Sequence, residues 1–244
     1  MRNQLTFAAA IAALGLIITA SILAKAYRFK FRHAEEVSVV GLAEVDFTSD
    51  LIVWNGSFER KANNLRDAYA SLKGDEAAIR TYLKGKGVPD SSIVISAVNI
   101  DKEFENTYDS RGNVASVFSG YRLSQKVKIQ SKDMDRVEAL SREVTELIEK
   151  GIEFKSEAPR YYYTQLANLK MDLLAKASED AKLRAETIAK SVDGSLGELK
   201  KANMGVFQIT GKNSDEDYSY GGTFNTADKQ KTASITIRMD YGLN

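Results

Sequence analysis

The segment Gly120-Tyr-Arg-Leu-Ser-Gln-Lys-Val-Lys-Ile-Gln130 decides the fold class, because side chains of opposite character alternate along it. Apolar side chains occupy odd positions such as Leu123 and Val127, and basic or small polar side chains occupy the even positions. This period of two is typical of an antiparallel strand with one face on the core and the other in solvent. The segment therefore predicts a sheet that is covered by helices on one side.

The rest of the chain supplies further strands and three helices. Apolar side chains at helical spacing predict helices over 65–85, 133–148 and 165–192, with Asn64 and either Ser131 or Asp133 as N-caps of the first two. The order ββαββαβαββ, with its hairpins, predicts an α+β fold, a mainly antiparallel sheet and helices packed on one side. The second sheet face is left for solvent or another subunit. Period-two alternation predicts the other strands at 37–41, 46–60, 93–105, 117–130, 152–158, 198–210 and 232–241.

Composition excludes several classes of function. The 244 residues allow one or two domains, and we expect an N-terminal membrane segment over 1–33 followed by one α+β domain over 34–244. Lys and Arg together number 34, against 33 Asp and Glu, so the chain has no basic excess and nucleic acid is not an expected partner.

The chain has no cysteine and a single histidine, His33. Thiolate nucleophiles, disulfides and zinc sites of the Cys/His kind are therefore excluded. A Ser-His-Asp triad would have to use His33, which follows the membrane segment in a basic stretch. We predict no catalytic residue, no metal ligand and no cofactor, and hence a protein that is not an enzyme.

The N-terminal segment predicts attachment to a membrane. No charged side chain occurs between Asn3 and Ala24, and a helix of about 22 residues is long enough to cross a hydrocarbon core. The apolar side chains that define this segment include Leu5, Leu14, Leu16, Ile17, Ile18 and Leu23.

Two features of this segment point in different directions. Ala24-Lys25-Ala26 has the small-x-small form of a signal cleavage site, but the apolar stretch is longer than a usual signal, so we favour an uncleaved anchor. The orientation in the membrane is also open. More basic residues follow the apolar segment than precede it, and because basic flanks favour the cytoplasmic side, this count predicts a cytoplasmic domain. The short N-terminal tail is instead typical of an export signal.

Several short motifs follow one another along the chain after the N-terminal segment. They are Val37-Ser-Val-Val-Gly-Leu-Ala-Glu44, Leu51-Ile-Val-Trp54, Gly120-Tyr121, Pro159-Arg-Tyr-Tyr-Tyr-Thr164, Ala177-Ser-Glu-Asp-Ala-Lys182, Ser195-Leu-Gly197 and Tyr218-Ser-Tyr-Gly-Gly222. Together these motifs resemble the SIMPL-domain family, the YggE-like envelope proteins. The resemblance runs from Glu36 to the C-terminus, and the order of the motifs is more specific than any one of them.

The resemblance implies an α+β domain on the periplasmic side of the cytoplasmic membrane. It further implies homo-oligomers, contacts with other envelope proteins and a loose association with stress tolerance. It brings no catalytic residues with it. For the orientation, it favours an exported domain over the cytoplasmic placement that the basic flank indicates.

Two aromatic clusters are candidate interaction sites. Tyr218, Tyr220 and Phe224 lie in a glycine-rich stretch, and they suit either a contact with another chain or packing back onto the domain. Tyr161 and Tyr163 flank a third tyrosine, and because neighbours on a strand face opposite ways, packing is the favoured role for them. The acidic run 215–217 lacks the alternation of a calcium loop, and we expect it to be solvated.

Three functions compete on this evidence. The leading hypothesis is a non-enzymatic, membrane-tethered or secreted envelope protein that assembles with itself. The second is a periplasmic ligand-binding module whose site is the tyrosine segment, residues 161–163, or the loop over 211–230. The third is a carboxylate-based hydrolase, which is disfavoured because neighbouring carboxylates such as Glu179 and Asp180 diverge on a helix.

Overall fold

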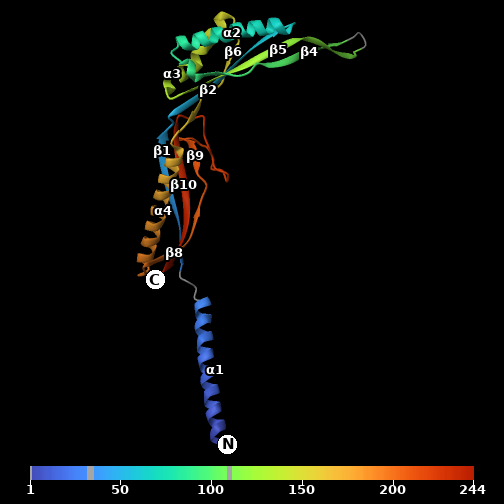
Figure 1. Cartoon of the computed structure of the whole chain (residues 1–244). Coiled ribbons are helices and arrows are strands. Elements are labelled where there is room, and N and C mark those ends of the chain that lie inside the picture. The colour runs from blue at the N-terminus through green and yellow to red at the C-terminus, as the bar shows by residue number, and fades with distance from the viewer. Residues whose placement is uncertain (1, 32–35, 109–111) are drawn as a thin grey trace. The chain divides into compact units, whose positions relative to one another are not determined.

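The fold is described from a computed structural model of residues 2–31, 36–108 and 112–244, with the side chains of the first helix described over 13–27 (Figure 1). The chain forms two units. Three long elements, β1 (Glu36–Thr48), α4 (Leu166–Ser191) and β10 (Gln230–Leu243), each contribute residues to both. Unit 1 contains Met1–Ala43, Ala175–Gly205 and Thr236–Asn244, and unit 2 contains Glu44–Leu174 and Val206–Ile235.

Unit 2 is built on a six-stranded sheet. Its strands follow the order β3-β5-β2-β6, with β4 beside β5 and β7 beside β2, and these pairs are antiparallel. The prediction of an α+β fold with antiparallel pairing is confirmed. The strands are β2 (Leu51–Ala62), β3 (Ile93–Ile95), β4 (Asn99–Tyr108), β5 (Val114–Ser131), β6 (Phe154–Ser156) and β7 (Arg160–Tyr162).

The alternation seen in the sequence sorts the two faces of this sheet. Trp54 lies opposite Ile129 in the β2–β5 ladder, and both side chains are fully buried. Their strand neighbours Asn55 and Lys128, also opposite each other, point to the other face, where Lys128 is exposed. One face therefore carries the core of unit 2 and the other is open, as predicted.

Two helices cover the core face of this sheet (Figure 1). Helix α2 (Leu65–Gly85) starts at Asn64, whose side chain accepts a hydrogen bond from the Asp67 N–H, so the predicted N-cap is confirmed. Helix α3 (Met134–Glu143) starts at Asp133 and continues as a 3₁₀ helix, Val144–Lys150. That helix ends at Gly151, whose φ of 71° lies in the left-handed region that glycine tolerates.

The predicted order of elements was too simple, because two segments expected to be single strands are each divided into two and a third is shorter than expected. The segment 93–105 divides into β3 and β4, and the register against β5 shifts by one residue between them, with Ile95 opposite Val127 and Asn99 opposite Ser124. The segment 152–158 holds only β6, with β7 starting at Arg160. The segment 198–210 divides into β8 (Leu196–Met204) and β9 (Gln208–Gly211).

Unit 1 holds helix α4 against a second sheet of order β1-β10-β8, in which β9 pairs with the part of β10 in unit 2. The helix side that meets the sheet is a row of alanines, including Ala177 and Ala181, which are fully buried. A Cβ on Gly41 of β1 would lie 2.1 Å from the Ala177 carbonyl oxygen, so glycine permits this close approach. Small side chains on both elements therefore let α4 lie close to β1.

Helix α1 (Arg2–Phe31) contains the segment that was expected to span a membrane. Its described side chains, among them Leu14, Leu16, Ile17, Ile18 and Leu23, are all exposed. Leu5 lies outside the described side chains. In the part of the chain that the structure describes, no helix has both the length and the apolar character needed to cross a membrane.

Candidate interaction surface

The residues from Gly211 to Gln230, here called the aromatic loop, connect β9 to β10 in unit 2. Tyr218 and Phe224 are more than half exposed, and Tyr220 is fully exposed. All three side chains are largely open to solvent, and the Tyr218 hydroxyl also bonds to Ser234 of β10 at 3.2 Å. An isolated exposed aromatic side chain needs no explanation, but three on one loop form a candidate contact surface.

The side chain of Gln208 in β9 holds the middle of the aromatic loop. Its amide nitrogen donates to the Ser219 carbonyl at 2.8 Å, and its oxygen accepts from the Thr223 N–H at 2.8 Å. Gln208 is buried, so these bonds form away from water. The backbone on both sides of Tyr220 is therefore fixed by a buried side chain.

Glu216 and Asn225 fix the ends of the same loop. The Glu216 carboxylate accepts from the Gly211 N–H at 2.9 Å and from the Asn225 amide at 2.6 Å. The Gly211 N–H, followed by Asn225, lowers the pKa of Glu216 below its usual value. This carboxylate is thus occupied with the loop backbone, and among the described residues no group of three or more acidic or histidine side chains could hold a metal ion.

Lys231, at the start of β10, joins the aromatic loop to the tyrosine segment. Its side chain is buried, and its ammonium group donates to the carbonyls of Tyr161 and Asn225, both at 2.6 Å. Burial lowers the pKa of Lys231 to about 8, against the opposing attraction of Asp228 and Glu216. A lysine is rarely buried, and here it satisfies two carbonyls that would otherwise lack donors.

The tyrosine segment meets the aromatic loop through its backbone and not through its rings. The Tyr161 N–H donates to the Thr226 carbonyl at 2.8 Å, while the Tyr161 ring packs against the core of unit 2. Tyr163 packs against Phe47, with ring centroids 5.0 Å apart. The packing role favoured for these tyrosines agrees with these positions, so Tyr218, Tyr220 and Phe224 are the stronger candidates for contact with another molecule.

Two cavities of unit 2 are candidate ligand sites. One, of about 580 Å³, adjoins the aromatic loop and is lined by Tyr218, Asp46 and Glu216 among others. Asp46 is itself engaged by Lys212 at 2.8 Å and by Thr232 at 2.7 Å. The other, of about 760 Å³, lies beside β6 and brings together two carboxylates and two ammonium groups, on Glu59, Glu153, Lys126 and Lys155.

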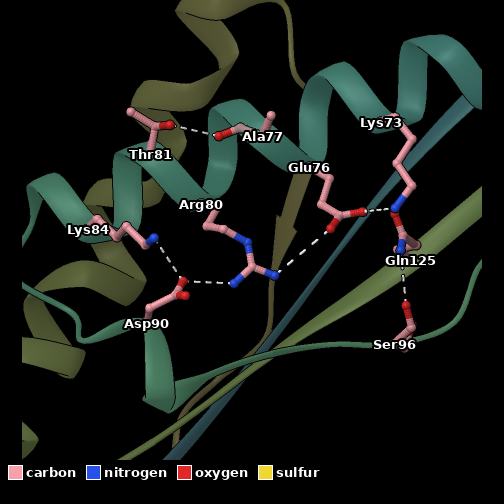
Figure 2. Close-up of polar contacts among 9 residues, drawn as sticks. All are labelled: Lys73, Glu76, Ala77, Arg80, Thr81, Lys84, Asp90, Ser96 and Gln125. Atoms are coloured by element: carbon pink, nitrogen blue, oxygen red, sulfur yellow. Dashed lines mark hydrogen bonds and ion pairs between the residues drawn. The ribbon is translucent and has the colours of Figure 1, made fainter.

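The charged side chains along α2 form the network shown in Figure 2. Lys73 lies 2.6 Å from Glu76, and Arg80 and Lys84 lie 2.8 and 3.1 Å from Asp90. Lys73 lowers the pKa of Glu76, and Arg80, followed by Lys84, lowers the pKa of Asp90. Carboxylates held in the charged form by neighbouring cations are poor general bases, so this network ties the 90–92 turn to the helix and offers no catalytic pair.

Asp180, one of the carboxylates considered for hydrolysis, is also occupied. In unit 1 its Oδ2 accepts from the Leu42 N–H at 2.9 Å and from Arg184 at 2.9 Å. The Leu42 N–H and then Arg184 lower the pKa of Asp180. A structural role at the edge of β1 therefore accounts for this side chain.

A second exposed apolar surface, which was not predicted from the sequence, lies on the outer half of the β4–β5 hairpin. Phe104 lies opposite Phe118, and their rings meet edge to face at a centroid distance of 5.9 Å. Beyond them Tyr108 lies opposite Val114, and all four side chains are exposed. The signal was the spacing of Phe104 and Tyr108, which lie four residues apart on the face that carries the core further along the hairpin.

The two sheets and their helices define an α+β protein in which the aromatic loop and the outer half of the β4–β5 hairpin expose apolar side chains. The chain belongs to the SIMPL family: the model of that family, described as a protein of unknown function (DUF541), matches residues 37–240. The match confirms the resemblance seen in the motifs. Comparison with curated proteins gives no match.

Proposed function

We propose that this chain is a non-enzymatic protein of the cell envelope that assembles with further copies of itself, with the aromatic loop as one contact surface. The observation that carries the proposal is the contrast within this loop. Its backbone is fixed by buried polar groups such as Gln208, while Tyr218 and Tyr220 remain exposed. Aromatic side chains on a rigid loop lose little conformational entropy on binding, which suits a contact surface.

The test of this contact compares the full chain with a triple variant, Tyr218→Ser, Tyr220→Ser and Phe224→Ser. Because these side chains are exposed, we expect the variant to keep its fold and to lose mass by light scattering, with an association constant at least tenfold lower. The control is Tyr69→Ser, which removes a half-exposed tyrosine from α2. An unchanged mass for the triple variant would remove the loop from the proposal.

Attachment to the envelope is proposed from the N-terminal segment. Residues 3–24 carry no charge, and described side chains of α1 such as Leu16 and Ile17 are exposed, as suits an apolar environment. We propose export of the domain to the periplasmic side, with the segment kept as an anchor. A reporter that is active only outside the cytoplasm, fused after Asn244, tests the side, and sequencing the N-terminus of the mature protein tests retention.

A second candidate function is ligand binding at the cleft of about 580 Å³ beside the aromatic loop. It is favoured by the position of Tyr218, which lines the cleft and bonds through its hydroxyl to Ser234 at 3.2 Å. A thermal-shift screen of the full chain against lipids, metals and cell-wall fragments tests it, because a ligand that binds the folded state raises its melting temperature. Flat shifts across the screen would count against this function.

A further inference from the structure

Strand β1 presents an open backbone edge in unit 1. It is the outer strand in the order β1-β10-β8, so among the described residues no strand pairs with its second edge. The Leu42 N–H points to that edge, since it donates to the Asp180 side chain of α4 at 2.9 Å. Backbone groups on a strand alternate in direction, so the N–H and C=O of Val40 and Ser38 point to the same open edge.

A groove runs beside this edge. Its volume is about 620 Å³, and it is lined by residues 38–40 of β1 and by side chains of α4 that include Leu183 and Ile188. Val40 and Ile188 are each 43% exposed and Leu183 is 62% exposed, so the apolar wall is open to solvent. A groove with backbone groups on one wall and apolar side chains on the other fits an added strand, because main-chain bonds supply affinity and side-chain pockets supply specificity.

The same sheet supplies a matching strand. Its other outer strand is β8, which pairs with β10 on one side only among the described residues. Leu199 and Met204 of β8 are 49% and 57% exposed, so they offer apolar side chains to a partner. Lys200 and Lys201 lie beside them and Glu198 precedes them, while the exposed Glu36 begins β1 and Arg184 lines the groove, so each edge carries charges of both signs.

We propose that the groove between β1 and α4 receives strand β8 of a second copy of this chain. The contact joins two unlike edges, so each copy has a groove and a strand to offer, and repetition of the contact gives a closed ring or a filament. Unpaired strand edges are otherwise sites of uncontrolled association, and this pairing satisfies both. The inference rests on the self-assembly proposed above and names a second contact surface for it, beside the aromatic loop.

Disulfide cross-linking tests the pairing directly, because the chain has no cysteine of its own. The full chain, kept in a non-ionic detergent, carries Ser38→Cys on β1 together with one of Lys200→Cys, Lys201→Cys or Ala202→Cys on β8. Only cysteines with Cα atoms within about 7 Å can be joined, so we expect at least one pair to give a ladder of linked chains after mild oxidation.

The control pairs Ser38→Cys with Arg66→Cys, an exposed position on α2. A ladder as strong in this control as in the β8 pairs would overturn the proposal. Efficient linking of the single variant Ser38→Cys to itself would also overturn it, because that result makes β1 of the second copy the occupant.

The variant Val40→Pro supplies an independent arm. It removes an N–H that points to the open edge, and proline is tolerated on edge strands, so the pairing of β1 with β10 remains. We expect at least a tenfold loss of association by light scattering, while Val40→Ala keeps the wild-type mass. If Val40→Pro does not fold, the cross-links decide the matter.

The failures of the two proposals are distinguishable. A monomeric wild-type chain would contradict self-assembly and this inference together. A wild-type oligomer that gives no β1–β8 cross-links and keeps its mass in folded Val40→Pro would contradict the inference alone.

Discussion

Replacement of the buried Lys231 by methionine tests how the aromatic loop is held. The ammonium group of Lys231 donates to the carbonyls of Tyr161 and Asn225, both at 2.6 Å, and methionine has a similar length but no donor. A buried acceptor without a donor costs about 1–3 kcal/mol, so the two carbonyls together lose about 4 kcal/mol. The charge of Lys231, in turn, is costly to bury.

That cost can be worked from the pKa. Burial lowers the pKa of Lys231 from 10.5 to about 8, and one pKa unit corresponds to about 1.4 kcal/mol, so the buried charge costs about 3 kcal/mol. The unfolded chain binds this proton more tightly, so the cost is fully present below pH 8 and is relieved as the pH rises from 8 to 10.5. A neutral amine still donates two hydrogen bonds, so both carbonyls stay satisfied.

The expected difference in unfolding free energy between wild type and Lys231→Met is therefore about 1 kcal/mol at pH 7 and about 4 kcal/mol near pH 10.5. Urea unfolding of both proteins at several pH values measures it, because the titrations that the two proteins share cancel in the difference. Lys212→Met is the control: its side chain is exposed, and its loss costs less than about 1 kcal/mol. A difference that stays constant from pH 7 to 10.5 would refute the reasoning.

Three further substitutions test a close approach in unit 1 and two positions on α2 in unit 2. Gly41→Ala places a Cβ 2.1 Å from the Ala177 carbonyl oxygen and should lower the free energy of unfolding in urea by about 3 kcal/mol. The control Gly74→Ala has open space around it and should stabilise α2 by about 0.5–1 kcal/mol. Equal effects of the two substitutions would contradict the close approach. Asp75→Ala leaves the Arg60 guanidinium, now 2.5 Å from that carboxylate, without its partner and should cost about 3 kcal/mol. A cost below about 1 kcal/mol would show that water replaces the pair.

The local structure was predictable from the sequence wherever residues close together in the chain determine it. The alternation around Leu123 and Val127 predicted both the strand β5 and its core face, because a strand with one buried face has a period of two. Asn64 predicted the start of α2, because its side chain satisfies an N–H that the first helical turn leaves free. The end of the second helical segment is local in the same way, because Gly151 adopts the left-handed conformation that closes it.

The remainder depended on contacts between segments that are distant in sequence. The break between β3 and β4 depends on their pairing with β5, about thirty residues away, because the register against β5 shifts by one residue between Ile95 and Asn99. The hydrogen bonds by which Gln208 and Lys231 anchor the aromatic loop could not be predicted from the sequence, because nothing in the sequence marks a lysine as buried. The open edge of β1 likewise follows only from the order of strands in the sheet.

The mass of the wild-type chain tests the central claim, self-assembly, most directly. Light scattering on the full chain in a non-ionic detergent, with the detergent mass subtracted, gives that mass over a dilution series from the micromolar to the nanomolar range. Self-assembly predicts a mass several times that of one 27.0 kDa chain at micromolar concentration, with dissociation on dilution. A single-chain mass across the whole series would contradict it.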